Sequence, residues 1–242
     1  MHRTQVQIYG SRLAAMRGGA WDATGTPALV IAASFLGFGS MAKAADLSMG
    51  MALFSTATGW ALPGQVVMLE LYAIGASLLV ISLAVALTNM RLLPMTLSLM
   101  PYLRTPGTPR WRYYAIAHLI AVTSWFHAMR KCPDLPPDER LPYLAGHGIL
   151  LWTVTMAATG IGYALAGAVP PAVSLGLVAV NPIYFALLLA NEYANPLRRN
   201  AVLIGAVLGP IFFLLDPDWS LLLTGVVGGS IAFLVGRARS GR

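Results

Sequence analysis

Long apolar stretches separated by short polar connections run through most of this chain. A helix needs about 17–25 predominantly apolar residues to cross a lipid bilayer, and several stretches come close to that length. They are Pro27–Ala44, Gln65–Leu87, Tyr113–Met129, Tyr143–Val169, Pro171–Ala190, Ala201–Leu215 and Trp219–Val235. The pattern therefore predicts an all-α fold.

Two further apolar segments are shorter and carry small polar residues or helix breakers. Leu47–Leu62 is rich in Ser, Thr and Gly, and Leu92–Leu103 is framed by Pro94 and Pro101. Within lipid, interrupted helices persist only where their backbone groups face protein or a wet cavity. We predict an all-α integral membrane protein, a polytopic helical bundle of about seven or eight spans with re-entrant or broken helices.

The predicted bundle occupies residues 26–236 as a single transmembrane transport domain. Residues 1–25 lack the apolar core of a secretory signal peptide. We expect a cytoplasmic tail there, either a short amphipathic surface helix or a disordered leader. Residues 237–242 form a short basic cytoplasmic tail.

The composition supports a membrane protein. Hydrophobic residues make up 57% of the 242 residues and charged residues only 10%. Because soluble domains carry about 25% charged residues, this composition excludes a water-soluble fold. The formal net charge of +7 is spread thinly between apolar runs, which favours membrane-orientation signals over a nucleic-acid surface. The sequence has no phosphate loop or metal-ligand spacing, and we predict no cofactor.

The excess of Lys and Arg in cytoplasmic connections predicts how the spans are oriented. It puts Arg130–Arg140, Arg198–Arg199 and the C-terminus in the cytoplasm, and counting backwards adds Asn89–Arg91. The N-terminus is also cytoplasmic if Leu47–Leu62, the segment after the first span, is re-entrant. The same count leaves the basic connection Arg104–Arg112 outside. If Leu92–Leu103 is itself re-entrant, that misfit disappears but every earlier segment inverts.

Polar side chains accompany the predicted breaks. Gln65 follows Pro63–Gly64, and Asn89 and Arg91 precede Pro94. An Arg near the membrane centre costs at least ~2.5–3.5 kcal/mol, so we expect Arg91 either in a cavity or at the lipid interface. Polar groups at broken helices are typical of a transport site, where half-helix N-termini face an anionic group of the solute.

Three other positions allow two interpretations each. Glu70 lies within an apolar stretch and is either an interfacial, paired carboxylate, which we favour, or a proton-handling group. Gly37 and Gly39 either let helices pack closely, which we favour, or let a substrate approach the backbone. Cys132 is the only cysteine, so no internal disulfide can form, and we expect an incidental residue in a polar loop.

Ser124 and His127 raise the alternative of an intramembrane Ser/His enzyme, with His118 as a second candidate base. Ser124 and His127 share a helix face because they are three residues apart. No orienting carboxylate and no G-x-S-x-G turn accompany them. We therefore favour hydrogen bonds across helices for these side chains and expect no enzyme.

Phe54–Gln65 reads F-S-T-A-T-G-W-A-L-P-G-Q, and Leu87–Leu103 reads L-T-N-M-R-L-L-P-M-T-L-S-L-M-P-Y-L. With S-L-G-L-V-A-V-N-P-I-Y-F-A-L-L-L-A at Ser174–Ala190, these segments resemble the AzlC family, the large subunits of bacterial branched-chain amino acid exporters. The likeness covers nearly the whole chain beyond Gly25. Its most specific part is the half-span that begins with Asn89–Arg91.

The resemblance implies a secondary transporter subunit that exports branched-chain or similar small apolar amino acids across the bacterial cytoplasmic (inner) membrane. It implies a multi-pass protein in the lipid bilayer with a small AzlD-like hydrophobic subunit as partner, and no nucleic acid. A transporter of another small amphiphilic solute is the alternative. Glu70 is the candidate for proton coupling. The candidate substrate-binding residues are Ser55, Gly59, Gly64, Gln65, Asn89, Arg91, Thr123 and Ser124.

The sequence departs from the family pattern at two places. Many relatives carry an Asp-Glu pair where this chain has Val122–Trp125, and an Asp near Val178–Ala179. If those acids carry protons in relatives, another group does so here or the substrate differs. Separately, Gly205 and Gly209, and likewise Gly225 and Gly229, have the spacing that favours close helix contact in lipid. We expect at least one of these two ridges, preferably that of Gly225 and Gly229, to face the partner subunit.

Overall fold

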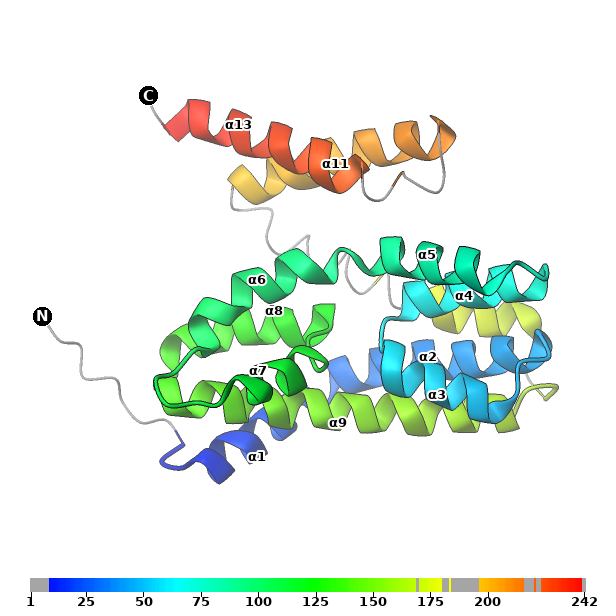
Figure 1. Cartoon of the computed structure of the whole chain (residues 1–242), viewed down its shortest axis with the longest axis horizontal. Helices are drawn as coiled ribbons and strands as arrows, with labels where there is room; N and C mark the ends of the chain where they lie inside the picture. Colours follow the sequence, from blue (N-terminus) through cyan, green and yellow to red (C-terminus); the bar gives the residue numbers. More distant parts are fainter. Residues whose placement is uncertain are drawn as a thin grey trace, which may run out of the picture.

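The computed structural model of the protein describes residues 9–168, 170–179, 183, 196–215, 220 and 223–240. Every regular element printed for these ranges is a helix, which confirms the predicted all-α fold. Two long helices form a frame, and shorter helices that begin or end in the middle of the molecule pack against it (Figure 1).

The frame consists of α2 (Thr26–Ala44) and α9 (Pro137–Ala164), which pack side by side along the long axis of the molecule (Figure 1). Both helices are long and apolar enough to cross a membrane. α2 confirms the predicted helix Pro27–Ala44. α9 overlaps the predicted stretch Tyr143–Val169, but it begins and ends earlier.

Glycines let α2 and α9 approach until backbone touches backbone. Gly39 lies against the Thr159 carbonyl, and Gly162 lies against the Leu36 carbonyl. A Cβ atom at either glycine would clash with backbone atoms, which cannot rotate out of the way as a side chain can. Gly37 is buried against backbone atoms in the same way. These contacts support the packing interpretation of Gly37 and Gly39.

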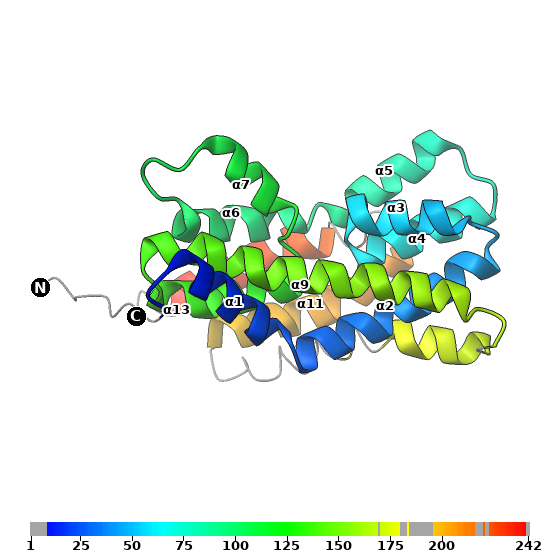
Figure 2. The ribbon, with the colours of Figure 1, turned by 90° about the horizontal axis from the view of Figure 1, so that it is seen from below.

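Part of the predicted N-terminal tail forms α1 (Arg12–Ala23), which packs along α9 (Figure 2). Gly19 lies against the Tyr143 carbonyl, and Gly146 lies against the backbone of α1. Arg12–Ala23 is therefore helical, and one face of this helix packs on α9 while the other is exposed. The cytoplasmic location of residues 1–25 stays a prediction.

The short helices begin with a hairpin. α3 (Met49–Gly59) runs toward the middle of the molecule and α4 (Leu62–Ala73) returns, with the tip at Trp60–Ala61 (Figure 1). The predicted re-entrant segment Leu47–Leu62 thus corresponds to the first arm and the tip of a helical hairpin.

The prediction of one continuous helix over Gln65–Leu87 is wrong. α4 stops half-way, and α5 (Leu78–Asn89) runs back alongside it. Gly75 has a φ of 73°, the left-handed conformation that ends helices. Ser77 then caps α5, because its hydroxyl accepts a hydrogen bond from the Val80 N–H (3.4 Å). Hydropathy alone does not register these stop and start signals.

α6 (Leu92–Leu103) follows α5 after a bend of 46° at Met90–Arg91, and the two helices together are long and apolar enough for one broken span. α7 (Arg110–Ala117) then runs back toward the middle, and α8 (Val122–Lys131) returns (Figure 1). The prediction of one continuous helix over Tyr113–Met129 is therefore wrong as well.

Two basic connections lie at the same end of the molecule. The Thr105 hydroxyl donates to the Pro137 carbonyl (3.1 Å), and Arg140 Nη1 donates to the Tyr102 carbonyl (3.1 Å). Segments in such contact cannot lie on opposite faces of a bilayer, so the orientation that left Arg104–Arg112 outside is wrong. The count failed because α7 and α8 form a hairpin and not a crossing.

We call this end, formed by Arg104–Arg112 and Arg130–Arg140, the basic end. Its concentration of positive charge predicts that it faces the cytoplasm. The same correction applies to Asn89–Arg91, which lies at the interior bend between α5 and α6 and not at the cytoplasmic surface.

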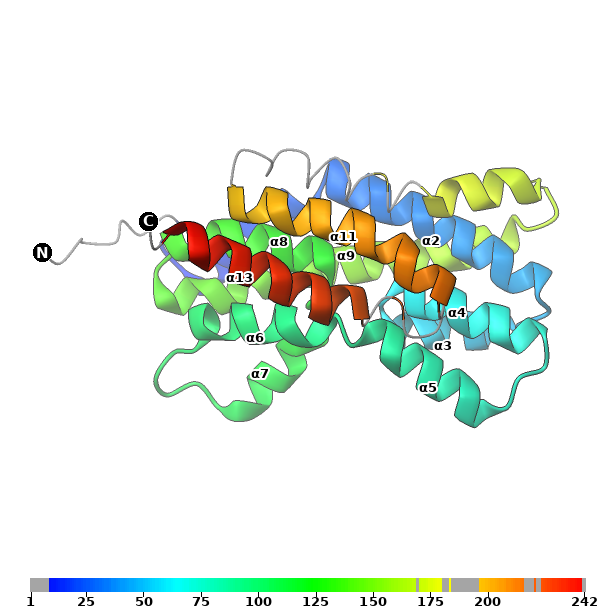
Figure 3. The same ribbon diagram turned by 90° about the horizontal axis from the view of Figure 1, so that it is seen from above.

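The last helices form a separate pair. α11 (Pro196–Leu215) packs against α13 (Gly229–Ser240) and the π-helical segment η2 (Thr224–Gly228) that precedes it (Figure 3). A Cβ atom added at Gly228 would lie 3.6 Å from the Ile204 side chain of α11. The predicted stretches Pro171–Ala190 and Trp219–Val235 lie only partly within the described residues, and they are helical at 171–179 and 223–235.

Within the described ranges, α2 and α9 meet the length and composition of a membrane span, and the bent pair α5–α6 makes a third. The helices α3, α4, α7 and α8 are too short to cross by themselves. Broken helices are therefore a feature of the structure, and the count of seven or eight spans stays a prediction.

We expect Gly39→Leu to separate α2 from α9. Overpacking typically costs ~1–3 kcal/mol, and here the obstacle is backbone, so the loss is at least of that size. Gly50→Leu is the matched control, because an added Cβ at Gly50 meets nothing within 4 Å. Thermal unfolding in detergent measures both. Equal midpoints for the two variants would contradict the backbone contact.

Candidate functional site

A cavity of about 670 Å³ lies in the middle of the molecule, where three short helices begin. Its lining includes Ala61–Pro63 at the start of α4, Arg91–Leu92 at the start of α6 and Ala121–Thr123 at the start of α8. The first N–H groups of a helix have no partner within the helix, so each start carries partial positive charge. Three helix starts on one cavity favour an anionic group there.

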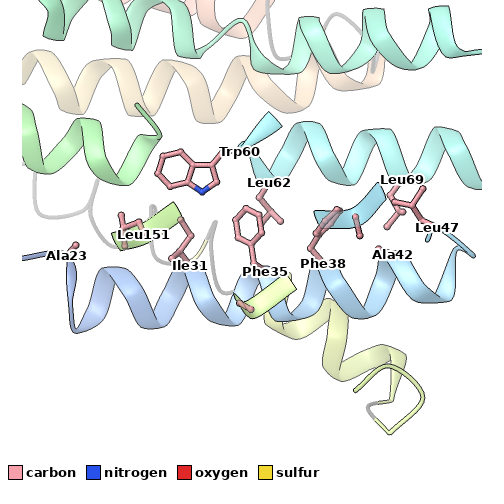
Figure 4. Packing of buried hydrophobic residues seen from close by; sticks show 12 residues of the cluster. Ala23, Ile31, Phe35, Phe38, Ala42, Leu47, Trp60, Leu62, Leu69 and Leu151 are labelled. Atoms are coloured by element: carbon pink, nitrogen blue, oxygen red, sulfur yellow. The ribbon is translucent and has the colours of Figure 1, made fainter. Parts of the chain in front are cut away.

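Apolar side chains form most of the remaining wall. Ile31 and Phe35 project from α2 toward Trp60 and Leu62 at the tip of the α3–α4 hairpin (Figure 4). The Trp60 indole N–H donates to the Thr155 hydroxyl of α9 (3.0 Å), which fixes the ring. A wall of this kind suits an aliphatic side chain.

Arg91 and Thr123 add polar side chains to this wall. The Nε atom of Arg91 is buried and has no hydrogen-bond partner in the described part of the chain. A buried polar group without a partner is costly, so this guanidinium is suited to bind an anion. Of the two predicted settings for Arg91, the structure supports the cavity.

Glu70 adds a carboxylate to the same cavity. Its side chain is exposed and forms no ion pair with the described residues, so the favoured interpretation of a paired carboxylate finds no partner there. Glu70 and Leu175 also line a second cavity of about 840 Å³. This second cavity lies between the ends of α2 and α4 and residues 166–171, away from the basic end.

Gly64 and Asn89 bring the two predicted breaks together. A Cβ atom at Gly64 would lie 2.6–2.9 Å from the amide group of Asn89, so a larger residue at position 64 would push the Asn89 side chain away. Asn89 Oδ1 is buried and lacks a hydrogen-bond partner among the described residues. The contact joins the start of α4 to the end of α5, directly before the bend.

Gln65 lies behind the cavity wall in a polar network. Its Nε2 donates to the hydroxyls of Ser55 (3.1 Å) and Thr56 (3.0 Å), and Thr56 is bonded to Thr159 of α9 (3.1 Å). Gln65 Oε1 is buried without a partner in the described residues. Gly59 is exposed at the end of α3 and does not belong to the cavity lining. Gln65, Ser55 and Gly59 therefore stand apart from Arg91 and Thr123.

Ser124 hydrogen-bonds to the backbone at the break before α8, and it does not pair with His127. Its hydroxyl accepts from the Ala121 N–H (2.9 Å) and donates to the Leu119 carbonyl (2.6 Å). His127 Nδ1 bonds instead to the Thr123 carbonyl (2.9 Å). A serine nucleophile with a histidine base is therefore not assembled, although the two side chains were expected to share a helix face.

Cys132 begins the short connection between α8 and α9, as expected, but its side chain is buried. It belongs to an apolar cluster with Leu99, Leu103 and Ala128. Burial raises the pKa of the Cys132 thiol to about 12, and the positive charge of Arg140 opposes only part of this shift. Because the thiolate is the reactive form, this thiol is inert at neutral pH.

The family model described as AzlC protein matches residues 27–169, which include both hairpins, the bend and the three helix starts. The chain belongs to the AzlC family. Family membership indicates a role related to amino acid transport, and together with the apolar helices it indicates a membrane protein. Members of the family are generally associated with a partner subunit. No curated protein and no solved structure matches the chain.

The positions where this AzlC-family chain departs from the family pattern lie on the cavity wall. Val122 and Thr123 line the cavity on one side, and Val178 and Ala179 line it on the other. Glu70 is the carboxylate of its lining.

Sequence reasoning missed the apolar half of the site. Trp60 stands directly beside a predicted break, so its position in G-W-A-L-P-G is a signal for a cavity wall. Phe35 and Leu175 carry no such signal, because they reach the cavity from distant helices.

We expect Thr56→Val to weaken the attachment of the α3–α4 hairpin to α9. It leaves Gln65 and Thr159 with unsatisfied polar groups, which cost ~1–3 kcal/mol each. Thr58→Val is the control, because the exposed Thr58 hydroxyl bonds only to the Phe54 carbonyl of its own helix. Denaturant unfolding of both variants should show a lower midpoint for Thr56→Val alone. Unchanged stability of Thr56→Val would exclude this role of the network.

Proposed function

We propose that this chain is the large subunit of a secondary transporter that exports branched-chain or similar small apolar amino acids across the bacterial cytoplasmic membrane. The convergence of three helix starts and Arg91 on one apolar cavity carries this proposal. Family membership supports the substrate class.

The cavity has a group of suitable chemistry for each part of such an amino acid. The substrate carboxylate binds to the helix starts and to the Arg91 guanidinium, whose Nε has no protein partner in the described chain. The ammonium group binds near Glu70, and the aliphatic side chain contacts Phe35 and Trp60. The volume of about 670 Å³ falls within the ~300–1,000 Å³ range of small-molecule sites.

The second cavity gives the solute a way out. It shares Glu70 and Leu175 with the first cavity and lies away from the basic end. With the basic end in the cytoplasm, a solute passes from the first cavity past Glu70 into the second, and then outside. Glu70 therefore contacts the substrate along its route.

We expect Arg91→Gln to reduce efflux of labelled leucine from membrane vesicles at least tenfold, because the substrate carboxylate loses its cation. Arg91→Lys retains the charge but not the fork of N–H donors, and we expect partial efflux. Arg110→Gln removes an equal charge from the exposed start of α7 and serves as the control.

Efflux from the Arg91→Gln vesicles at the rate of the unchanged protein would contradict the proposed binding of the substrate carboxylate by Arg91. Equal losses in Arg91→Gln and Arg110→Gln would indicate a general charge effect and not carboxylate binding.

We also propose that the last helices bind a small AzlD-like hydrophobic subunit. Gly228 faces α11, whereas added Cβ atoms at Gly225 and Gly229 meet none of the described residues within 4 Å. These two glycines form the floor of a shallow groove of about 610 Å³ with Phe233 and Leu234 on its wall. Small residues on an open helix face favour close helix contact in lipid.

Replacing Gly225 and Gly229 together by Leu should fill this groove. We expect the small subunit to stop co-purifying and export to cease, while the large chain still inserts. Gly205→Leu is the control, because Gly205 on α11 also faces open space but lies outside the groove. Full transport by the purified large chain alone in liposomes would disprove the two-subunit arrangement.

A further inference from the structure

His147 is a buried titratable group that the proposed substrate site does not use. It lies on α9 with 1% of its surface exposed. Both ring nitrogens are buried and have no hydrogen-bond partner in the described part of the chain. Structural histidines in protein interiors are hydrogen-bonded, because an unpaired buried nitrogen is unfavourable. His147 therefore needs another explanation.

A second histidine faces it from α8. The ring centroids of His127 and His147 are 4.9 Å apart, with the ring planes inclined by 35°. His127 Nδ1 lies 2.9 Å from the Thr123 carbonyl, which can only accept, so Nδ1 carries a hydrogen. In the neutral ring, Nε2 is then left as a proton acceptor.

The groups around this pair come from three helices. Asp22 of α1 accepts a hydrogen bond from the Tyr143 hydroxyl (2.8 Å), and the Tyr143 ring lies 6.5 Å from the His147 ring. The same surroundings form a cavity of about 330 Å³ near the basic end, and its lining is Asp22, Phe126, His127, Arg130, Lys131 and Tyr143. With two cations and one carboxylate there, and two rings in contact, a second proton on the pair is repelled.

On its other side the pair is joined to the substrate cavity through Thr123, although neither ring lines that cavity. His127 is bonded to the backbone of Thr123, and Thr123 lines that cavity. His127 also lines the small cavity near the basic end, where Asp22 and Arg130 are exposed. The pair thus lies between the substrate cavity and the surface of the basic end.

We propose that His127 and His147 form a single-proton binding site that passes protons between the substrate cavity and the cytoplasmic surface. This inference rests on the proposed transport function. A proton from the substrate cavity forms an N–H bond with one ring, and the same N–H bond breaks when the proton leaves through the small cavity. One proton enters and one leaves, while the substrate moves the opposite way.

Proton binding can be measured without transport. The full chain with isotope-labelled histidine in lipid nanodiscs gives imidazole NMR signals, which His127→Gln and His147→Gln assign. We expect the pair to take up no more than one proton as the pH is lowered, with the signals of both rings shifting in the same step. Two independent one-proton titrations, or no titration of either ring, would overturn the proposal.

Transport tests the coupling. In proteoliposomes that contain the chain and its partner, we expect His147→Gln to keep leucine counterflow within twofold and to lose at least tenfold in accumulation driven by a pH gradient. His118→Gln, at an exposed ring bonded to the Ala57 carbonyl (2.8 Å), should keep both activities. Unchanged gradient-driven accumulation in a His127→Gln, His147→Gln double variant would refute the coupling. If the unchanged protein shows neither activity, the proposed function fails, and the NMR titration still decides the proton site.

Discussion

A helix that begins inside an apolar fold leaves backbone N–H groups without partners, and the chain itself has to supply replacements. This constraint acts at three places around the central cavity. At α8 the Ser124 hydroxyl bonds to both backbone groups of the break. At α4 and α6, beside Arg91, no described side chain caps the helix start. The Leu93 N–H is bonded to the Met90 carbonyl (3.0 Å), and Pro63 and Pro94 have no N–H, so few N–H groups of these starts remain for a ligand.

The same structure divides into a rigid frame and hairpins with fewer attachments. Backbone contacts at Gly39 and Gly162 fix α2 on α9. The tips of both hairpins meet one carbonyl, that of Ala57, which accepts from Trp152 Nε1 of α9 (3.2 Å) and bonds to a His118 ring nitrogen (2.8 Å). The tips of the two hairpins therefore lie together beside α9, where Leu119 and Ala121 also pack against the cluster that contains Trp60 and Leu62.

The sequence predicted the helical class, the first long helix and the presence of the two breaks, because proline, glycine and amides mark those breaks directly. It failed where a long apolar run conceals a reversal. Gly75 and Ser77 turn the chain within such a run, and the break before Ser124 does the same without any proline. Both errors arose because a long apolar run was taken for one membrane crossing. The second error placed Arg104–Arg112 on the wrong side of the predicted membrane. The cavity wall could not be predicted, since Phe35 and Leu175 approach it only through tertiary packing.

The long separation in sequence between α2 and α9 has a consequence for biosynthesis. Ribosomes add about 5–20 residues per second, so α1 and α2 are in place for several seconds before α9 is complete. During that interval, α9 is not yet present to pack against Gly19 and Gly39. The α3–α4 and α7–α8 hairpins, which are synthesised between α2 and α9, also lack the completed frame. Assembly of this protein therefore passes through a half-built state in which the glycine faces of α1 and α2 have not yet met α9.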